Sequence, residues 1–232
     1  MAGIVYIHVP KCGGSSFSAA LKLRYIFSQE TISLNQGDPR LKGHDYILSD
    51  YNSRDAQLGT SMSKNTKLIS GHVRYNPAMH RFGADKYSFI TLLRDPVQRF
   101  VSHYNYLQRQ HPDPNRPSAL DAFLETDDAA RIASQYLFYF ARYEHNAPTN
   151  KQAAVQRAID NLRQFSLIGD LSSPAQFASA LARMSGMPLP VWHRNKAPNP
   201  TYVPPRLYSK ISDLCAGDIE IYDAVQNRRI AA

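Results

Sequence analysis

The chain has 232 residues, enough to bury the core of one α/β domain, and its 43% hydrophobic and 20% charged residues exclude wholesale disorder. The 27 lysines and arginines exceed the 19 acidic residues and leave a formal charge of +8, which favours anionic partners in general. No basic run is long enough for a nucleic-acid arm, so we expect no nucleic-acid partner.

The sequence carries no clear pattern for a signal peptide, a membrane-spanning segment or a disulfide framework. The first residues lead directly into an apolar segment without the basic start and long apolar stretch of a signal peptide, and no segment is apolar for long enough to span a membrane. We therefore expect a cytoplasmic protein without an integral membrane segment. Cys12 and Cys215 are too few for a disulfide framework or a metal site, and both are expected to be free thiols.

The opening segment predicts a strand, a phosphate-binding loop and a helix. Residues 4–9 are rich in β-branched and aromatic side chains and too few for a helix, so we predict a buried strand that Pro10 ends. Glycines in the loop allow an anion to approach the backbone, and the N–H groups that open the helix over 17–27 have no internal partner. The candidate anion-binding residues are Lys11, Cys12, Gly13, Gly14, Ser15 and Ser16.

The order of residues in this loop excludes one known motif. The triphosphate loop of kinases and GTPases is G-x-x-x-x-G-K-[ST], with the lysine after the glycines, whereas Lys11 precedes them here. The loop taken alone is equally compatible with a plain glycine turn that carries an exposed lysine.

Residues 67–73 predict a second strand, which runs into Gly71 and His72. Ligand sites of parallel sheets lie beyond the carboxyl ends of the strands, so His72 should reach the same edge as the Lys11 loop. An unperturbed pKa of roughly 6.5 suits a histidine to removing a proton near neutral pH, which makes His72 a candidate base. The alternative is a core histidine bonded to a backbone carbonyl.

Residues 87–104 predict a third strand followed at once by a helix, with Asp95 as N-cap and Pro96 at the first helical position. The apolar stripe of this helix predicts that Arg99, Ser102 and His103 point away from it. The Arg94 guanidinium, just before this helix, can give a phosphate two parallel charge-assisted hydrogen bonds. The alternative is a helix-capping ion pair of Arg94 with Asp95 and a solvated Ser102.

Together the loop P-K-x-G-G-[ST]-[ST], the G-H-V element and the pattern R-D-P-x-x-R-x-x-S resemble sulfotransferases that use 3′-phosphoadenosine 5′-phosphosulfate (PAPS). The resemblance is strongest to the carbohydrate type that includes heparan sulfate 2-O-sulfotransferase. It implies that the Lys11 loop holds the 5′-phosphosulfate, that Arg94 and Ser102 bind the 3′-phosphate, and that His72 is the base. It implies no metal.

The same resemblance implies a hydroxyl-bearing acceptor, such as a glycan or glycolipid, and adenosine 3′,5′-bisphosphate as a product. Family members also carry an Asn-Lys loop over the cofactor, which here corresponds to Arg194, Asn195 and Lys196. An exposed basic loop is an equally good interpretation of those three residues.

The remaining segments carry weaker signals. We expect turns at 38–39 and 50–53, a strand at 46–48 and acceptor-facing loops over 29–66. Helices are predicted over 119–126, 128–143, 151–164, 174–184 and 207–230, with a strand over 166–170. The aromatic residues between 136 and 143 are interpreted as core.

We therefore predict a single domain over 1–232 with a helical insertion at about 112–164. Its fold is expected to be three-layer α/β, of the nucleotide-kinase-like (P-loop-like) sulfotransferase type, with a mostly parallel sheet of four or five strands. Two other functions stay open. One is a Mg²⁺-dependent nucleoside-triphosphate kinase or hydrolase, and the other is a non-catalytic polyanion-binding module, in which His72 has no role.

Overall fold

The computed structural model describes residues 2–146, 150–186 and 203–229. The chain forms two compact units. The sheet unit consists of Met1–Leu92 and Gln164–Arg194, and the helical unit consists of Leu93–Arg163 and Asn195–Ala232. The predicted insertion over 112–164 falls almost wholly within the helical unit, which begins earlier and also takes in the C-terminal segment. No helix of the described residues has the length and apolar character needed to cross a membrane.

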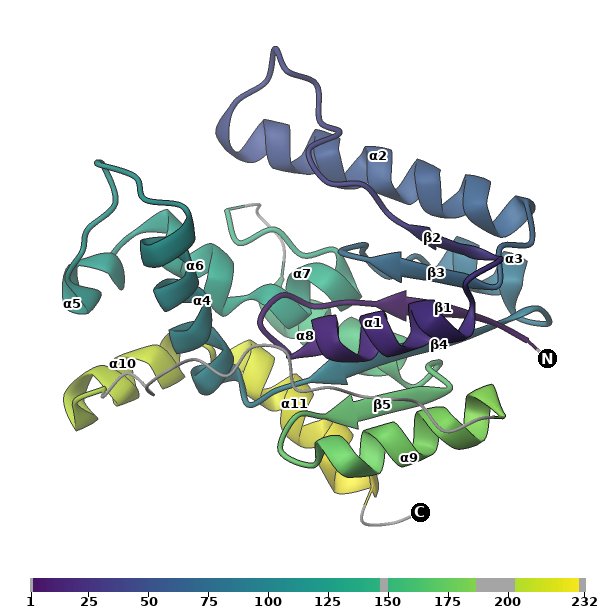
Figure 1. The fold of residues 1–232 in the computed structure, drawn as a ribbon. Coiled ribbons are helices and arrows are strands. Elements are labelled where there is room, and N and C mark those ends of the chain that lie inside the picture. Colours follow the sequence, from purple (N-terminus) through teal and green to yellow (C-terminus); the bar gives the residue numbers. More distant parts are fainter. Residues whose placement is uncertain (1, 147–149, 187–202, 230–232) are drawn as a thin grey trace. The chain divides into compact units, whose positions relative to one another are not determined.

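A five-stranded sheet forms the centre of the sheet unit (Figure 1). Its spatial order is β2-β3-β1-β4-β5, and β1 pairs in parallel with both β3 and β4. Ile7 at the end of β1 is in register with Gly71 of β3 and Thr91 of β4, so the three carboxyl ends meet at one edge. This confirms the predicted α/β fold. The strands are β1 (Gly3–Ile7), β2 (Gln29–Thr31), β3 (Leu68–Gly71), β4 (Tyr87–Leu93) and β5 (Leu167–Asp170).

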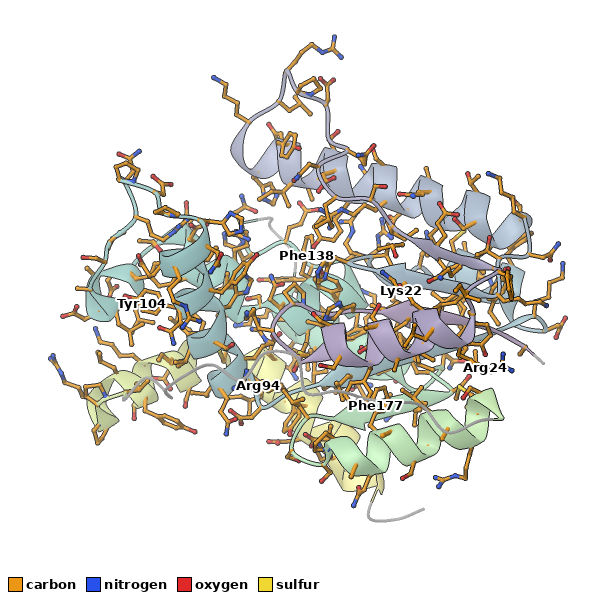
Figure 2. The ribbon with its side chains drawn as sticks, viewed as in Figure 1. Lys22, Arg24, Arg94, Tyr104, Phe138 and Phe177 are labelled. Atoms are coloured by element: carbon orange, nitrogen blue, oxygen red, sulfur yellow. The ribbon has the colours of Figure 1, made fainter. Side chains whose placement is uncertain are left out.

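One face of the sheet is covered by α1 (Gly14–Arg24) and α9 (Pro174–Ser185). Alternate strand residues such as Ile4 and Tyr6 pack against Phe17 of α1 and Phe177 of α9. The rings of Phe17 and Phe177 meet edge to face with centroids 4.9 Å apart, and Figure 2 labels Phe177 on α9. α1 begins three residues before the predicted start, because Gly14, Ser15 and Ser16 are already helical.

The turn predicted at 38–39 is present, with the Leu41 N–H donating to the Asp38 carbonyl at 3.0 Å, whereas the expectations for residues 46–53 were wrong. The predicted strand at 46–48 and turn at 50–53 both lie within α2 (Gly43–Ser63), and β2 with α2 fills most of the segment expected to form loops. The buried face of α2 carries Asp50, Arg54 and Asp55 beside Leu58 and Met62. A helix that buries charged residues lacks the apolar period by which sequence reasoning finds helices.

The described part of the helical unit contains seven helices, several of which differ from the prediction. The expected helix over 128–143 is two helices that meet at Ser134, and the expected helix over 207–230 is also two, which meet at Cys215. The expected helix over 119–126 is a single turn. The helices are α4 (Pro96–Gln110), α5 (Leu120–Phe123), α6 (Asp127–Ala133), α7 (Gln135–Ala141), α8 (Lys151–Leu162), α10 (Pro205–Leu214) and α11 (Ala216–Arg229).

The orientation predicted for two residues of α4 was also wrong. Arg99 is fully buried and His103 is only 9% exposed, although both were expected to point away from the packed face. Arg99 can lie inside because Asp218 of α11 approaches it within 3.6 Å, and a buried cation needs such a partner. Cys12 and Cys215 are both buried and are free thiols, as predicted.

Candidate functional site

The loop between β1 and α1 has an unusual backbone. Lys11 has φ 66° and Gly13 has φ 73°, so both lie in the left-handed region, which a lysine seldom adopts. Such conformations are retained where surrounding structure enforces them, and they cluster at functional sites. Gly13 is the N-cap of α1 and supplies no side-chain cap, which suits the start of this helix to an external anion.

The loop lies directly on the side chains of β1 and the residue after it. A Cβ atom on Gly14 would come within 2.3 Å of the His8 ring and 2.6 Å of the Tyr6 hydroxyl, so only glycine fits without a shift. Tyr6 is fully buried, and its hydroxyl makes no hydrogen bond with the described residues. Burial raises the pKa of Tyr6, which keeps the hydroxyl protonated beneath the loop. The Cys12 side chain is also buried, so Cys12 can influence an anion mainly through the shape of the loop.

His72 follows β3 at the edge where the Lys11 loop follows β1. Its ring stacks on His8 with centroids 4.6 Å apart, and its Nδ1 lies 2.6 Å from the backbone carbonyl oxygen of His8. A carbonyl oxygen only accepts hydrogen bonds, so Nδ1 carries the hydrogen and Nε2 holds the lone pair. The bond to a backbone carbonyl is the one expected for a structural histidine. In the half-buried His72, however, it also sets the tautomer that a base requires.

Both histidines are neutral near pH 7. Burial lowers the pKa of His72, and Arg54 lowers it further, whereas the hydrogen bond to His8 opposes them. Burial is also the main reason that the pKa of His8 falls to about 3, with smaller contributions from His72, Lys11 and Lys22. His72 is therefore ready to accept a proton at neutral pH, and His8 is too weak a base to compete.

Arg54 is a residue of this site that sequence reasoning missed. Its Nη1 donates to the backbone carbonyl of His72 at 3.0 Å, it forms a buried ion pair with Asp50, and its guanidinium carbon lies 4.3 Å from the ring centroid of Tyr51. These contacts attach the segment after β3 to α2. The four-residue spacing of Asp50 and Arg54, typical of a helical ion pair, was the signal that could have revealed them.

The second candidate phosphate site lies in the helical unit. Arg94 directly follows β4, and Ser102 lies in the second turn of α4; both are half-buried (Arg94 is labelled in Figure 2). Asp95 caps α4 as predicted, with its carboxylate accepting from the Gln98 backbone N–H at 2.8 Å, and Pro96 occupies the first helical position. The proposed lid residues Arg194, Asn195 and Lys196 lie outside the described residues.

The described residues fit the phosphate groups that the sequence implies. The start of α1 has no side-chain cap, a lysine precedes it in a constrained backbone, and glycine is required beneath it. Phosphate oxygens are the ligands that such a helix start binds. The fold and this loop thus define an α/β protein whose first strand leads into a loop with the features of a phosphate-binding loop.

Comparison with known proteins gives the family. The sequence profile of the sulfotransferase family matches residues 2–187, and the chain belongs to that family of sulfuryl-transferring enzymes. No curated protein sequence matches the chain significantly.

Two sulfotransferases are among the solved structures that resemble the chain. The first is a sulfotransferase from Alicyclobacillus acidocaldarius, with a TM-score of 0.56 and 17% identity over 97% of this chain and 95% of that one. The second is the mouse sulfotransferase SULT7A1 complexed with PAP, with a TM-score of 0.46 and 14% identity over 93% of this chain and 63% of that one. The first likeness supports the same fold.

Proposed function

We propose that this sulfotransferase takes its sulfuryl group from PAPS and transfers it to a hydroxyl of a carbohydrate, in a glycan or glycolipid. The observation that most supports this is the placement of the Lys11 loop and His72 at the carboxyl edge of the neighbouring strands β1 and β3. Transfer of a sulfuryl group to an alcohol is helped by a loop that binds the donor's phosphate and by a neutral histidine that can accept the alcohol's proton, here at Nε2. The carbohydrate acceptor follows from the resemblance to the 2-O type, and the formal charge of +8 suits an acidic glycan.

The binding roles are divided between two sets of residues. Lys11 and the loop from Cys12 to Ser16 bind the 5′-phosphosulfate, and Arg94 and Ser102 bind the 3′-phosphate. Arg194, Asn195 and Lys196 are proposed to cover the cofactor as lid residues. When bound, PAPS supplies an activated sulfuryl group with a phosphate as leaving group.

The residues of the chain then act by positioning and by charge. His72 Nε2 accepts the proton of the acceptor hydroxyl as the oxygen attacks, while the Nδ1 bond to the His8 carbonyl holds the ring in place and favours the charged form that results. The Lys11 ammonium offsets negative charge that grows on the leaving phosphate. No metal is required in this scheme.

A transfer assay tests the function. Radiolabelled PAPS is offered with a panel of glycans, glycolipids and small alcohols, and we expect label to enter a glycan in the presence of EDTA. A requirement for Mg²⁺ and a nucleoside triphosphate would favour a kinase or hydrolase instead. Salt-dependent binding to heparin, without transfer and without affinity for adenosine 3′,5′-bisphosphate, would indicate a polyanion-binding module.

Binding of the product tests the role of Arg94. We expect the chain to bind adenosine 3′,5′-bisphosphate much more tightly than AMP, and Arg94→Ala to remove about 2–4 kcal/mol of that preference, because the 3′-phosphate loses its charged partner. Calorimetry with both ligands measures the two affinities. Arg109→Ala, at an exposed position on α4, is the control and should keep the preference. Equal affinity of the wild-type protein for both ligands would show that the second motif is structural.

A further inference from the structure

The side chain of Tyr136 holds the backbone of Arg94. Tyr136 lies in the first turn of α7 and is fully buried. Its hydroxyl accepts a hydrogen bond from the Arg94 N–H at 2.8 Å and donates one to the Arg94 carbonyl oxygen. The two bonds reach the two peptide groups on either side of one Cα atom, so they restrict both backbone dihedrals of Arg94.

Arg94 needs such a contact because of its place in the chain. It lies at the junction between the end of β4 and the N-cap of α4, where the hydrogen-bonding pattern of the strand gives way to that of the helix. Backbone groups that are shielded from water must find partners elsewhere. A guanidinium gives two parallel bonds to a phosphate only from a suitable direction, and a fixed Cα limits the directions that this long side chain explores.

Tyr136 is itself fixed by the C-terminal helix α11. Asp218 accepts hydrogen bonds from the backbone N–H groups of Tyr136 at 2.8 Å and Leu137 at 3.1 Å, and is 1% exposed. Arg99 lies 3.6 Å from the Asp218 carboxylate, donates to the Ile132 carbonyl, and places its guanidinium carbon 5.5 Å from the Tyr136 ring centroid. The backbone and the ring of Tyr136 are thus both held from inside the helical unit.

We propose that Tyr136 is a positioning residue that aims Arg94 at the 3′-phosphate, and that Asp218 keeps Tyr136 in place. This rests on the proposed function, in which Arg94 binds that phosphate. Asp218 lies beyond residues 2–187, which match the family, so the support comes from a segment that the family match does not include. The C-terminal helix thereby contributes to cofactor recognition without touching the cofactor.

The test compares the affinities of two ligands for Tyr136→Phe. This variant removes one oxygen and keeps the packed ring. We expect the dissociation constant for adenosine 3′,5′-bisphosphate to rise about tenfold, the effect of losing one to two hydrogen bonds, while that for AMP changes less than about twofold. The measured quantity is the ratio of the AMP dissociation constant to the adenosine 3′,5′-bisphosphate dissociation constant, which should fall. Calorimetry is run well below the unfolding midpoint of each variant, so that a loss of stability alone leaves this ratio unchanged.

Two further variants complete the test. Tyr104→Phe removes another buried hydroxyl, which bonds to the Ser118 carbonyl in the same unit, and should leave the ratio unchanged. Asp218→Asn keeps one acceptor oxygen and should also lower the ratio, but by less than Tyr136→Phe does. It preserves the test if Tyr136→Phe fails to fold. If Arg94→Ala lowers the ratio and neither Tyr136→Phe nor Asp218→Asn does, the positioning inference is wrong. If Arg94→Ala leaves the ratio unchanged, the assignment of Arg94 itself is wrong.

Discussion

Replacing His72 by alanine is expected to reduce sulfuryl transfer by about a hundredfold or more, the usual scale for losing a general base. Binding of adenosine 3′,5′-bisphosphate should stay nearly unchanged, because His72 is assigned to the acceptor and not to a phosphate. His72→Asn should be no better, since an amide forms hydrogen bonds but takes up no proton. Single-turnover transfer and calorimetry measure the two quantities separately.

The pH dependence gives a second readout for His72. The protonated ring accepts no further proton, so the rate should be low in acid and rise with pH through one ionisation. Burial and Arg54 lower the pKa of His72, so the midpoint should lie below the ordinary value of roughly 6.5 and the rate should be level at neutral pH. The His72 variants should lack this rise.

His111, which is exposed, provides the matched control, and His111→Ala should transfer at the wild-type rate. Unchanged transfer by His72→Ala would remove His72 from the mechanism. So would loss of the fold in both His72 variants, which would make the residue structural. Because His8 is too weak a base, His103 would then be the next candidate.

Asp218→Ala is expected to lower the free energy of unfolding by about 3–5 kcal/mol, the scale for breaking a buried ion pair. The change leaves the fully buried Arg99 without its charged partner and the Tyr136 and Leu137 N–H groups without an acceptor. Burial raises the pKa of Asp218 to about 6, with Arg99 and the two N–H groups opposing that rise, so the carboxylate is ionised at pH 7.5. Urea unfolding at pH 7.5 measures the loss.

Two variants identify the cause of that loss. Asp160→Ala removes the acidic partner of an exposed pair, in which Arg163 and Asp160 are 41% and 52% exposed, and should change stability by less than about 0.5 kcal/mol. Asp218→Leu combined with Arg99→Met should recover much of the stability, because a hydrophobic pair of similar volume needs no charge partner. A double variant as unstable as Asp218→Ala would show that the hydrogen bonds to α7 matter more than the charge.

The fold was predictable where apolar runs are short and clearly ended. β1, β3 and β4 each lie in a run of apolar residues that a glycine, a proline or a charged residue ends, and their parallel pairing follows from the helices between them. α2 was missed because its buried positions include Asp50, Arg54 and Asp55, which satisfy one another or their neighbours only after folding. The breaks at Ser134 and Cys215 were missed because helix periodicity continues across them.

The motifs of the candidate site could be predicted from the sequence, whereas the residues that hold His72 and Arg94 in place could not. The sequence placed the Lys11 loop and His72 at one edge of the sheet, and the structure confirms that placement, whereas their chemical roles stay predictions. The carbonyl of His8 is the partner of the His72 side chain, which lies 64 positions away in the sequence. The contact of Tyr136 with Arg94 spans 42 positions, and no local pattern encodes either distance.

Several contacts at the site use main-chain atoms, and this makes them robust to mutation. The carbonyl of residue 8 stays in place whatever side chain is attached, so substitutions there should alter the ring stacking and leave the tautomer of His72 intact. In the same way, Tyr136 bonds to the peptide groups of residue 94, and Arg94→Ala therefore removes the guanidinium alone. Sequence drift at positions 8 and 94 can thus change recognition while the scaffold that orients both sites persists.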